Sequence, residues 1–410
     1  MDRFYRARFD TINAISHVNY EFNSNRHLQL ACLNGNFENV FWLMQHNDIT
    51  EEVIVCAIIG NNQDVVRYMN EWCNNSIAIA VCHFGRLDCM KLLKSNGYSF
   101  DVLEINATCR FGNIQNVIWL KDIGCSFNYY GLIHTVCETK NIELFNWLLD
   151  NGCEADEYTQ WHVCRTGNLA FAKSFLAHGY TFTDFGMSGA SFSGNLELMK
   201  FIDNIIHKPC ESEYIIISAC NTGICENVQW LIDHDYRISV MAFEAASHKG
   251  NLEIMKLLKK YNCPWSSRVL NYACNFGDIK NIEWLITSGC PTNQYTIEWC
   301  IRPTNGNIIP ILKLLIKNGC NLNTTTFDLA CYYRRLDVIE WLLENNCPVS
   351  KDAFYTICYL AADSIGFRIR YTKIISKILY SYHFIDHLEK YMSDPIVAKA
   401  LNGALQHTCV

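Results

Sequence analysis

The stretch Ala273-Cys274-Asn275-Phe276-Gly277, followed by Trp284-Leu285, decides the fold of this chain because it recurs about every 27 residues. A second clear copy is Ala219-Cys220-Asn221-Thr222-Gly223 with Trp230-Leu231. A period of this length is typical of a repeat array. The residue at the glycine position of each copy, which we call the anchor, is in turn Gly35, Gly60, Gly85, Gly112, Lys140, Gly167, Gly194, Gly223, Gly250, Gly277, Gly306 and Arg334.

Each copy predicts two helices joined by a tight turn. The anchor suits the left-handed residue that ends a helix, and the Asn or Asp that follows it in most copies suits the start of the next. The segment Gly250–Lys260 then has apolar residues at helical spacing. Small residues before the anchor predict close packing of the first helix, and Trp seven residues after it predicts packing between units. These tryptophans are Trp42, Trp119, Trp147, Trp230, Trp284 and Trp341.

Composition favours a folded protein with a continuous core. Half of the 410 residues are hydrophobic and only 18% are charged, which argues against disorder. The net charge is −7 and no run of Lys or Arg occurs, so we do not expect a nucleic-acid partner. No apolar stretch is long enough for a signal or a membrane span. The sequence therefore predicts an intracellular, cytoplasmic protein that is a monomer.

The 22 cysteines are predicted to be reduced thiols that pack in the core. One set stands three residues before an anchor, where Ala57, Ser191 and Ser247 replace cysteine in other copies. Its members are Cys32, Cys82, Cys109, Cys137, Cys164, Cys220, Cys274 and Cys331. No Cys-x-x-Cys pair occurs, so neither a metal site nor a cofactor is expected.

Catalysis is a weaker alternative. Cys82 next to His83, and His162 two residues before Cys164, are the candidate nucleophile and base pairs. Both pairs fall on a first helix, where cysteine should face the core and His83 the groove. No phosphate-binding loop or hydrolase motif accompanies them. We therefore expect no enzyme activity.

The phrase as a whole resembles the ankyrin repeat, because Ala-Ala/Cys, two variable residues, Gly-Asn-Leu-Glu, a Trp/Leu-Leu pair and Asn-Gly-Cys occur in that order. It is similar in particular to the short, Trp- and Cys-rich repeats common in giant viruses of amoebae. The resemblance implies an all-α solenoid of about twelve helix-turn-helix repeats. Ankyrin repeats usually have 33 residues, so the shorter period here implies shortened or missing β-turn fingers.

The two ends of the chain depart from the phrase. We expect an N-terminal cap over residues 1–24, the repeat array over 25–350, and a degenerate repeat with a C-terminal helical cap over 351–410. Cys358 lies 27 residues beyond Cys331, which predicts a thirteenth, broken unit with its second helix near Tyr371 to Tyr380.

The variable residues just before the anchors are the candidate partner-binding residues, because a stack of repeats lines them up along one concave side. Aromatic residues beside Arg and His resemble interface anchors, although Phe84, Phe111 and Phe276 can instead pack under the turns. We therefore predict a non-catalytic scaffold for a host or viral partner protein; the alternative is a structural or self-assembling component of a viral particle or factory. The candidates are His83, Phe84, Arg110, Phe111, Glu138, Arg165, Asn221, His248, Asn275, Phe276, Tyr332 and Tyr333.

Overall fold

The computed structural model describes residues 32, 75–127, 131–206, 212–302, 308–363, 368–381 and 391–406. All regular structure in these residues is helical, and they contain no strand, which confirms the predicted all-helical solenoid. The predicted cap over 1–24 and the anchors Gly35, Gly60 and Gly306 lie outside the described residues.

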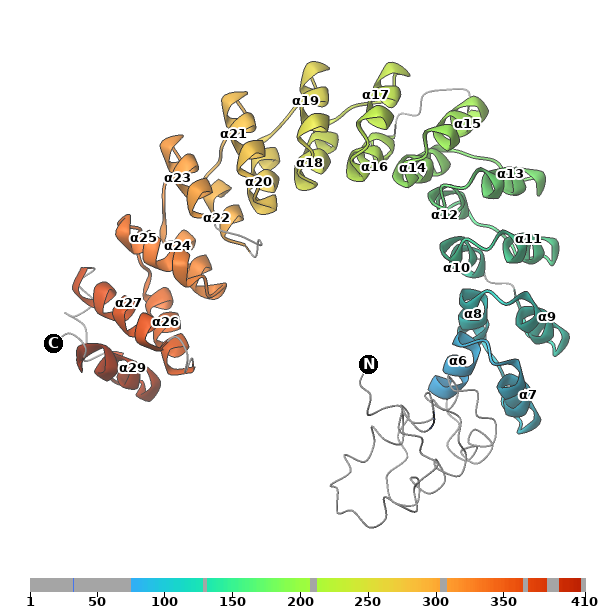
Figure 1. Cartoon of the computed structure of the whole chain (residues 1–410), viewed down its shortest axis with the longest axis horizontal. Helices are drawn as coiled ribbons and strands as arrows, with labels where there is room; N and C mark the ends of the chain where they lie inside the picture. Colours follow the sequence, from blue (N-terminus) through green and yellow to red (C-terminus); the bar gives the residue numbers. More distant parts are fainter. Residues whose placement is uncertain are drawn as a thin grey trace, which may run out of the picture. The chain divides into compact units, whose positions relative to one another are not determined.

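Each repeat consists of a first helix, a turn at the anchor and a second helix (Figure 1). The first helices are α6 (Asn75–His83), α8 (Val102–Phe111), α10 (Gly131–Thr139), α12 (Thr159–Arg165), α14 (Asp184–Ser193), α16 (Tyr214–Thr222), α18 (Val240–His248), α20 (Ser267–Phe276), α22 (Thr296–Ile301) and α24 (Thr324–Tyr332). The second helices are α7 (Leu87–Ser95), α9 (Ile114–Asp122), α11 (Ile142–Asp150), α13 (Leu169–Ala177), α15 (Leu196–Ile206), α17 (Cys225–Asp233), α19 (Leu252–Lys260), α21 (Ile279–Thr287), α23 (Ile309–Lys317) and α25 (Leu336–Glu344).

The chain forms two compact units, Met1–His207 and Lys208–Val410. In unit 1, first helices pack on first helices from α6 through α14. In unit 2, the same layer runs from α16 through α26 (Lys351–Asp363). Second helices form the other layer of each unit, for example α11 beside α13 and α17 beside α19 (Figure 1).

The anchors have the predicted left-handed backbone wherever they are described. Gly112 has φ +86° and is the C-cap residue of α8. The two anchors that are not glycine follow the same rule, with φ +58° at Lys140 and +54° at Arg334. A side chain in this region costs about 1–2 kcal/mol, so the fold demands this conformation even where the sequence does not favour it.

A second turn follows each second helix except α15, where the next residues lie outside the described ranges, and it also uses the left-handed region. In α11, the amide of Cys153 donates to Leu148 O at 3.0 Å and that of Gly152 to Leu149 O at 3.1 Å. These bonds satisfy carbonyls at the end of the helix. At the same turn in three other repeats the left-handed residue is not glycine but Asp235, Asn262 or Asn346.

Asparagine side chains connect neighbouring repeats through the first turns. Asn251 starts α19: its Oδ1 accepts from the amide of Ile254 at 3.1 Å, and its Nδ2 donates to the carbonyl of the preceding anchor, Gly223, at 2.9 Å. Asn141 and Asn195 make the same pair of bonds in unit 1. One side chain therefore caps its own helix and binds the repeat before it.

The predicted core cysteines are buried. Every member of the set that precedes the anchors is buried, from Cys32 to Cys331, and Ser191 and Ser247 are fully buried in the equivalent places. Large side chains such as Phe145, Phe171 and Phe243 are also fully buried in the core. Small groups at these positions let successive first helices approach each other closely.

The tryptophans seven residues past the anchor pack less deeply than a core position requires. Trp341 is buried, whereas Trp119, Trp147, Trp230 and Trp284 are half-buried. Their rings meet aromatic residues of the loops that join repeats: Trp147 makes an edge contact with Phe127, with centroids 5.9 Å apart. Their packing is therefore between a second helix and a loop, at the rim of the core.

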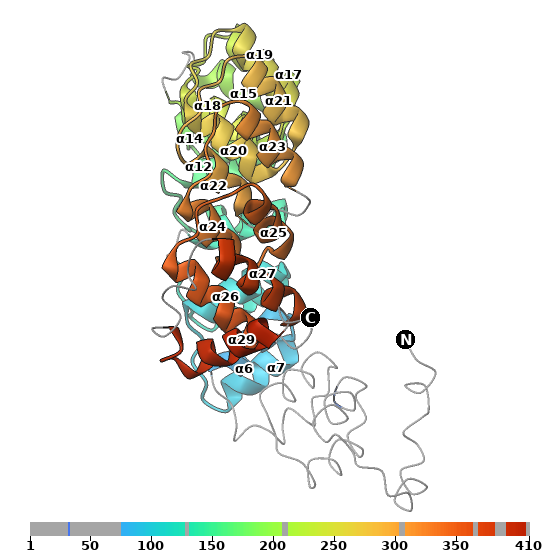
Figure 2. The ribbon, with the colours of Figure 1, turned by 90° about the vertical axis from the view of Figure 1, so that its left-hand side faces the viewer.

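The C-terminal segment also folds as helices. After α26, α27 (Arg368–Ser381) spans the region where a second helix of a broken unit is expected. The last described helix, α29 (Pro395–Gln406), packs against both α26 and α27 (Figure 2).

Candidate functional site

The candidate residues stand at the ends of the first helices and differ in exposure. His83, Arg110, Glu138, Arg165 and His248 are exposed, and Tyr332 is 74% exposed. Asn221, Asn275, Phe84 and Tyr333 are half-buried. Within each unit, these residues follow one another along the layer of first helices.

Two of the aromatic candidates cover a neighbouring turn. A Cβ placed on Gly85 would overlap the ring of Phe111, and one placed on Gly250 would overlap the ring of Phe276. Both rings nevertheless stay about half exposed, at 50% and 49%. Phe111 and Phe276 therefore pack on the anchor of the preceding repeat while keeping one ring face toward solvent.

In unit 1, Arg110 at the end of α8 pairs with Glu138 at the end of α10, with Nη2 and Oε2 3.3 Å apart. Both side chains are about half exposed, so solvent screens the pair and its contribution to stability is small. The pair fixes the direction of both side chains at the surface of the first-helix layer.

Arg165, at the end of α12, lies against two aromatic rings. Its Cζ is 5.1 Å from the ring centroid of Trp161 and 5.4 Å from that of Phe192 on α14. Sequence reasoning selected Arg165 but missed both rings. Trp161 stands four residues before Arg165, so the helical spacing that puts them on one face could have identified it.

Two histidines stack beside this arginine, and sequence reasoning left both out of the binding face. The rings of His134 (α10) and His162 (α12) have centroids 4.1 Å apart and are nearly parallel, at 9°. Nε2 of His134 is 3.1 Å from Oδ1 of Asp156 and 3.0 Å from Oγ1 of Thr159. Nδ1 of His162 is buried and has no hydrogen-bond partner among the residues that the structure describes.

The environment of His162 keeps its ring neutral. Burial, followed by the nearby His134, lowers the pKa of His162 from 6.5 to about 4. Asp156 contacts His134: desolvation raises the pKa of Asp156, but hydrogen bonds from Thr159 and His134 outweigh this and lower it overall. His162 is therefore a neutral ring that stacks on His134, and Nε2 of His134 faces the carboxylate of Asp156.

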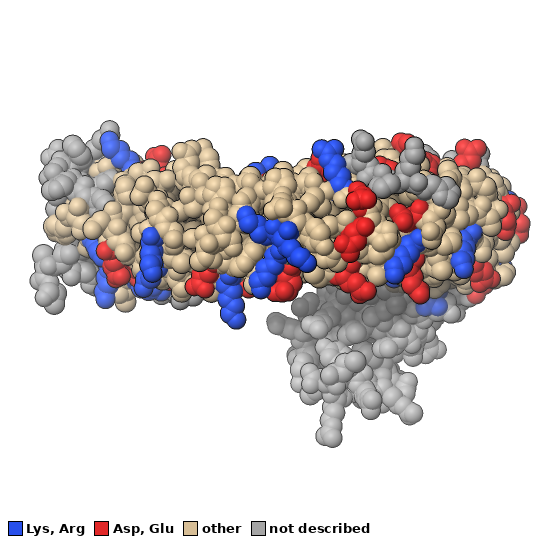
Figure 3. All heavy atoms as spheres, turned by 90° about the horizontal axis from the view of Figure 1, so that it is seen from above, with Lys and Arg blue, Asp and Glu red and all other residues tan. Residues whose placement is uncertain are grey.

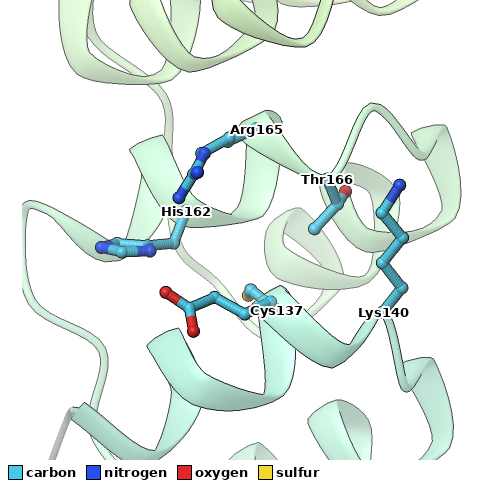
Figure 4. A pocket seen from close by; sticks show the side chains of 6 residues that line it. Cys137, Lys140, His162, Arg165 and Thr166 are labelled. Carbon is cyan, nitrogen blue, oxygen red and sulfur yellow. The ribbon is translucent and has the colours of Figure 1, made fainter. Parts of the chain in front are cut away.

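A hollow of about 490 Å³ opens between the ends of α10 and α12. Figure 4 shows Arg165 and His162 above the hollow, with Lys140 and Thr166 at its other side. Glu138 and Cys137 complete the lining. The hollow therefore has a lining that is both polar and apolar and that carries charges of both signs.

In unit 2, aromatic rings and arginines lie in a row along the ends of the first helices. Tyr272 (α20) makes edge contacts with His248, at 5.6 Å between centroids, and with Trp299 (α22), at 5.5 Å. Cζ of Arg302 lies 4.1 Å from the centroid of Trp299. Tyr272 and Trp299 were missed in the sequence because they stand one helical turn before the variable pair.

The buried thiols of Cys82 and Cys109 are held in the protonated form. Burial raises the pKa of Cys109 to about 12, and it raises the pKa of Cys82 likewise. A thiolate is the nucleophile and the metal ligand, so these thiols are chemically inert at neutral pH. Within the residues that the structure describes, no three His, Cys, Asp or Glu side chains form a possible metal site.

Outside the first-helix layer, charges of both signs are scattered. Figure 3 shows one face on which uncharged residues cover most of the surface and Lys or Arg side chains lie near Asp or Glu. Among the helices of the described ranges, none combines the length and the apolar character that a membrane span needs.

Comparison with known proteins finds weak similarity to other helical repeats. Neither a protein-family model nor a curated protein matches the sequence. Among solved structures, the human ASB11 ankyrin repeat domain is similar, at 17% identity and a TM-score of 0.26. The similarity covers 46% of this chain and 84% of the ASB11 domain.

The pentatricopeptide repeat protein PPR10, solved in complex with an 18-nucleotide psaJ RNA element, is similar to 92% of this chain, at 11% identity and a TM-score of 0.39. A second structure, of PPR10 from maize, is similar to 86% of this chain, at 14% identity and a TM-score of 0.30. This chain spans 65% and 63% of those two chains, less than two thirds of their length. All three TM-scores are below 0.5, so the likeness does not decide between ankyrin and pentatricopeptide repeats.

Proposed function

We propose that this chain is a non-catalytic scaffold that binds a partner protein through the exposed ends of its first helices. The observation that carries the proposal is the set of arginine and aromatic side chains at consecutive first-helix ends. Tyr332 is 74% exposed, and Arg165 lies against Trp161 and Phe192 at the surface. Tyr, Trp and Arg are the side chains that most often anchor protein interfaces.

The architecture supports the same proposal. A stack of repeats presents an extended surface on which each repeat adds its own contacts. The positions that hold the repeats together, such as Cys220 and Cys274, are fully buried and cannot contact a partner. The residues at the first-helix ends are therefore free to vary with the partner while the core stays the same.

The proposal is tested by affinity capture from the cell that makes the protein, followed by mass spectrometry. A variant with Arg110, Arg165 and Tyr332 all changed to Ala removes two cations and one aromatic ring from the face. We expect it to lose most of the partner that the wild-type chain recovers, since truncating an interface anchor costs about 2 kcal/mol or more.

The matched control changes three exposed lysines of second helices, Lys91, Lys173 and Lys313, to Ala. We expect this variant to recover the partner as the wild type does. Equal recovery by both variants and the wild type would contradict the choice of face. Circular dichroism of both variants establishes that they remain folded.

A further inference from the structure

Arg165 presents an unpaired cation at the edge of the hollow between α10 and α12. The rings of Trp161 and Phe192 hold the guanidinium at 5.1 and 5.4 Å. Among the residues that the structure describes, no carboxylate forms an ion pair with Arg165. A guanidinium that contacts rings through its flat face still has N–H donors at its edge.

Lys140 adds a second cation to the same hollow. It is the anchor between α10 and α11, and its left-handed backbone, with φ +58°, sets the direction in which its side chain leaves the turn. Within the described ranges no carboxylate pairs with it either. Figure 4 shows Lys140 and Arg165 on either side of Thr166.

The balance of charge around the hollow is positive. Glu138 is the acidic residue in its lining, and Arg110 pairs with that carboxylate at 3.3 Å. The lining therefore holds two cations, Arg165 and Lys140, against the one carboxylate of Glu138, although the chain as a whole carries −7. A site of this sign on a chain with a net negative charge is complementary to an acidic group.

We propose that this hollow binds the carboxylate side chain of an acidic segment in the partner protein. The inference rests on the proposed function, since it assigns a chemistry to part of the same face. Arg165 donates two parallel hydrogen bonds to the carboxylate, the geometry that its planar fork fits, and Lys140 adds an attractive point charge. Because the two rings already hold Arg165, little side-chain freedom is lost on binding.

The test uses the full chain and a fluorescein-labelled hexaglutamate peptide, with binding measured by fluorescence anisotropy. We expect the wild type to bind it and not to bind the matched hexaglutamine peptide. The change Arg165→Gln should weaken hexaglutamate binding about tenfold or more, because a hydrogen bond to a charged group is lost. The change Lys140→Gln should weaken binding less, about threefold, because it removes only a point charge at the surface.

Two further variants serve as controls. Arg165→Lys keeps the charge but not the planar fork, so we expect binding between those of the wild type and Arg165→Gln. Lys173→Gln, on the exposed side of α13, makes the same change of charge in the same unit and should bind as the wild type does. Thermal unfolding of each variant separates lost binding from lost folding.

Three results would overturn the inference: no binding of hexaglutamate by the wild type, equal loss in Lys173→Gln and Arg165→Gln, or binding of a phosphoserine peptide in preference to hexaglutamate. The third would assign the hollow to phosphoryl groups. Partner capture by the variant with Arg110, Arg165 and Tyr332 changed to Ala distinguishes failure of the scaffold proposal from failure of the carboxylate site. If capture depends on the face but hexaglutamate does not bind, the scaffold proposal stands and the carboxylate site is wrong.

Discussion

The two turns of each repeat share a backbone conformation but differ in what surrounds them. At the first turn, Gly250 has φ +68° and the ring of Phe276 covers it, so that a Cβ has no room. At the second turn, Gly289 has φ +83° and no atom lies within 4 Å of the place where its Cβ would be. The ring of Phe276 therefore couples the first turn to the next repeat, whereas at the second turn the contact is made by a thiol: Cys290 Sγ donates to Ser266 O, 3.7 Å away.

The largest effect is expected from replacing the covered glycine. Gly250→Ala places a methyl group in the ring of Phe276 as well as a side chain in the left-handed region, so we expect a loss of about 3 kcal/mol in the free energy of unfolding. Gly289→Ala meets only the backbone penalty and should cost about 1 kcal/mol. Urea unfolding of both variants measures the difference.

The double variant Gly250→Ala with Phe276→Ala gives the control for this pair. Removing the ring removes the overlap, so the double variant should be more stable than the sum of the two single losses predicts. Strict additivity would show that the ring does not restrict the turn.

The next largest loss of stability is expected from an exposed aromatic residue that packs on the fold, as opposed to one that is available to a partner. Phe276→Ala removes a ring that is half buried on Gly250 and should cost about 1.5 kcal/mol of stability. Tyr332→Ala removes a ring that is 74% exposed and should change stability by less than about 0.5 kcal/mol. Similar losses in thermal denaturation would mean that Tyr332 also holds the fold.

A smaller effect is expected at the asparagine that links repeats. Asn251→Asp keeps the acceptor that caps α19 but loses the donor to Gly223 O, so we expect a cost of about 1 kcal/mol. Asn168 caps α13 through the amide of Ala170 and makes no such bond to another repeat within the described residues. Asn168→Asp should therefore be neutral or slightly stabilising, and an equal loss in both variants would contradict the link.

The last effect concerns acid stability and is confined to pH values below about 6.5. His162 faces His134 and Glu138 from α10, and Arg165 and Asp156 from its own repeat. Its pKa is about 4 in the fold and 6.5 when unfolded, so the folded state binds fewer protons between these values. Stability should therefore fall as the pH falls from about 6.5 to 4.

The change His162→Gln removes this titration, because glutamine does not ionise. We expect the melting temperature of this variant to decline less steeply than that of the wild type over the same pH range. Parallel declines would show that His162 does not contribute, and that the carboxylates alone set the acid response.

The helix pairs could be predicted because the residues that form each turn recur in each repeat. Gly112 and Gly277 mark left-handed caps directly, and even Lys140 and Arg334 could be placed there from their spacing alone. The buried state of Cys220 also followed from the exchange of Cys with Ala and Ser among copies. Both patterns recur in many repeats, so a single repeat with an unusual residue, such as Lys140, does not obscure them.

The contents of the candidate site were harder to predict, because they depend on contacts between different repeats. Spacing placed Arg165 at the end of a first helix, but it could not place Phe192 beside it, since that ring comes from the next repeat. The stack of His134 on His162 is of the same kind. The half-buried Trp119 and Trp147 were predicted to lie deeper, because a large apolar ring alone does not distinguish a core from its rim.

The asparagine link between repeats binds a main-chain carbonyl, an atom that every amino acid possesses. A Cβ on the preceding anchor would nevertheless lie 3.1 Å from Nδ2 of Asn141 or Asn251, so the link favours a glycine at that turn. A repeat that carries its own Asn can therefore follow any repeat whose anchor is glycine. Such a coupling allows a gene to lengthen by duplication of one unit, and it leaves each new copy free to acquire its own surface.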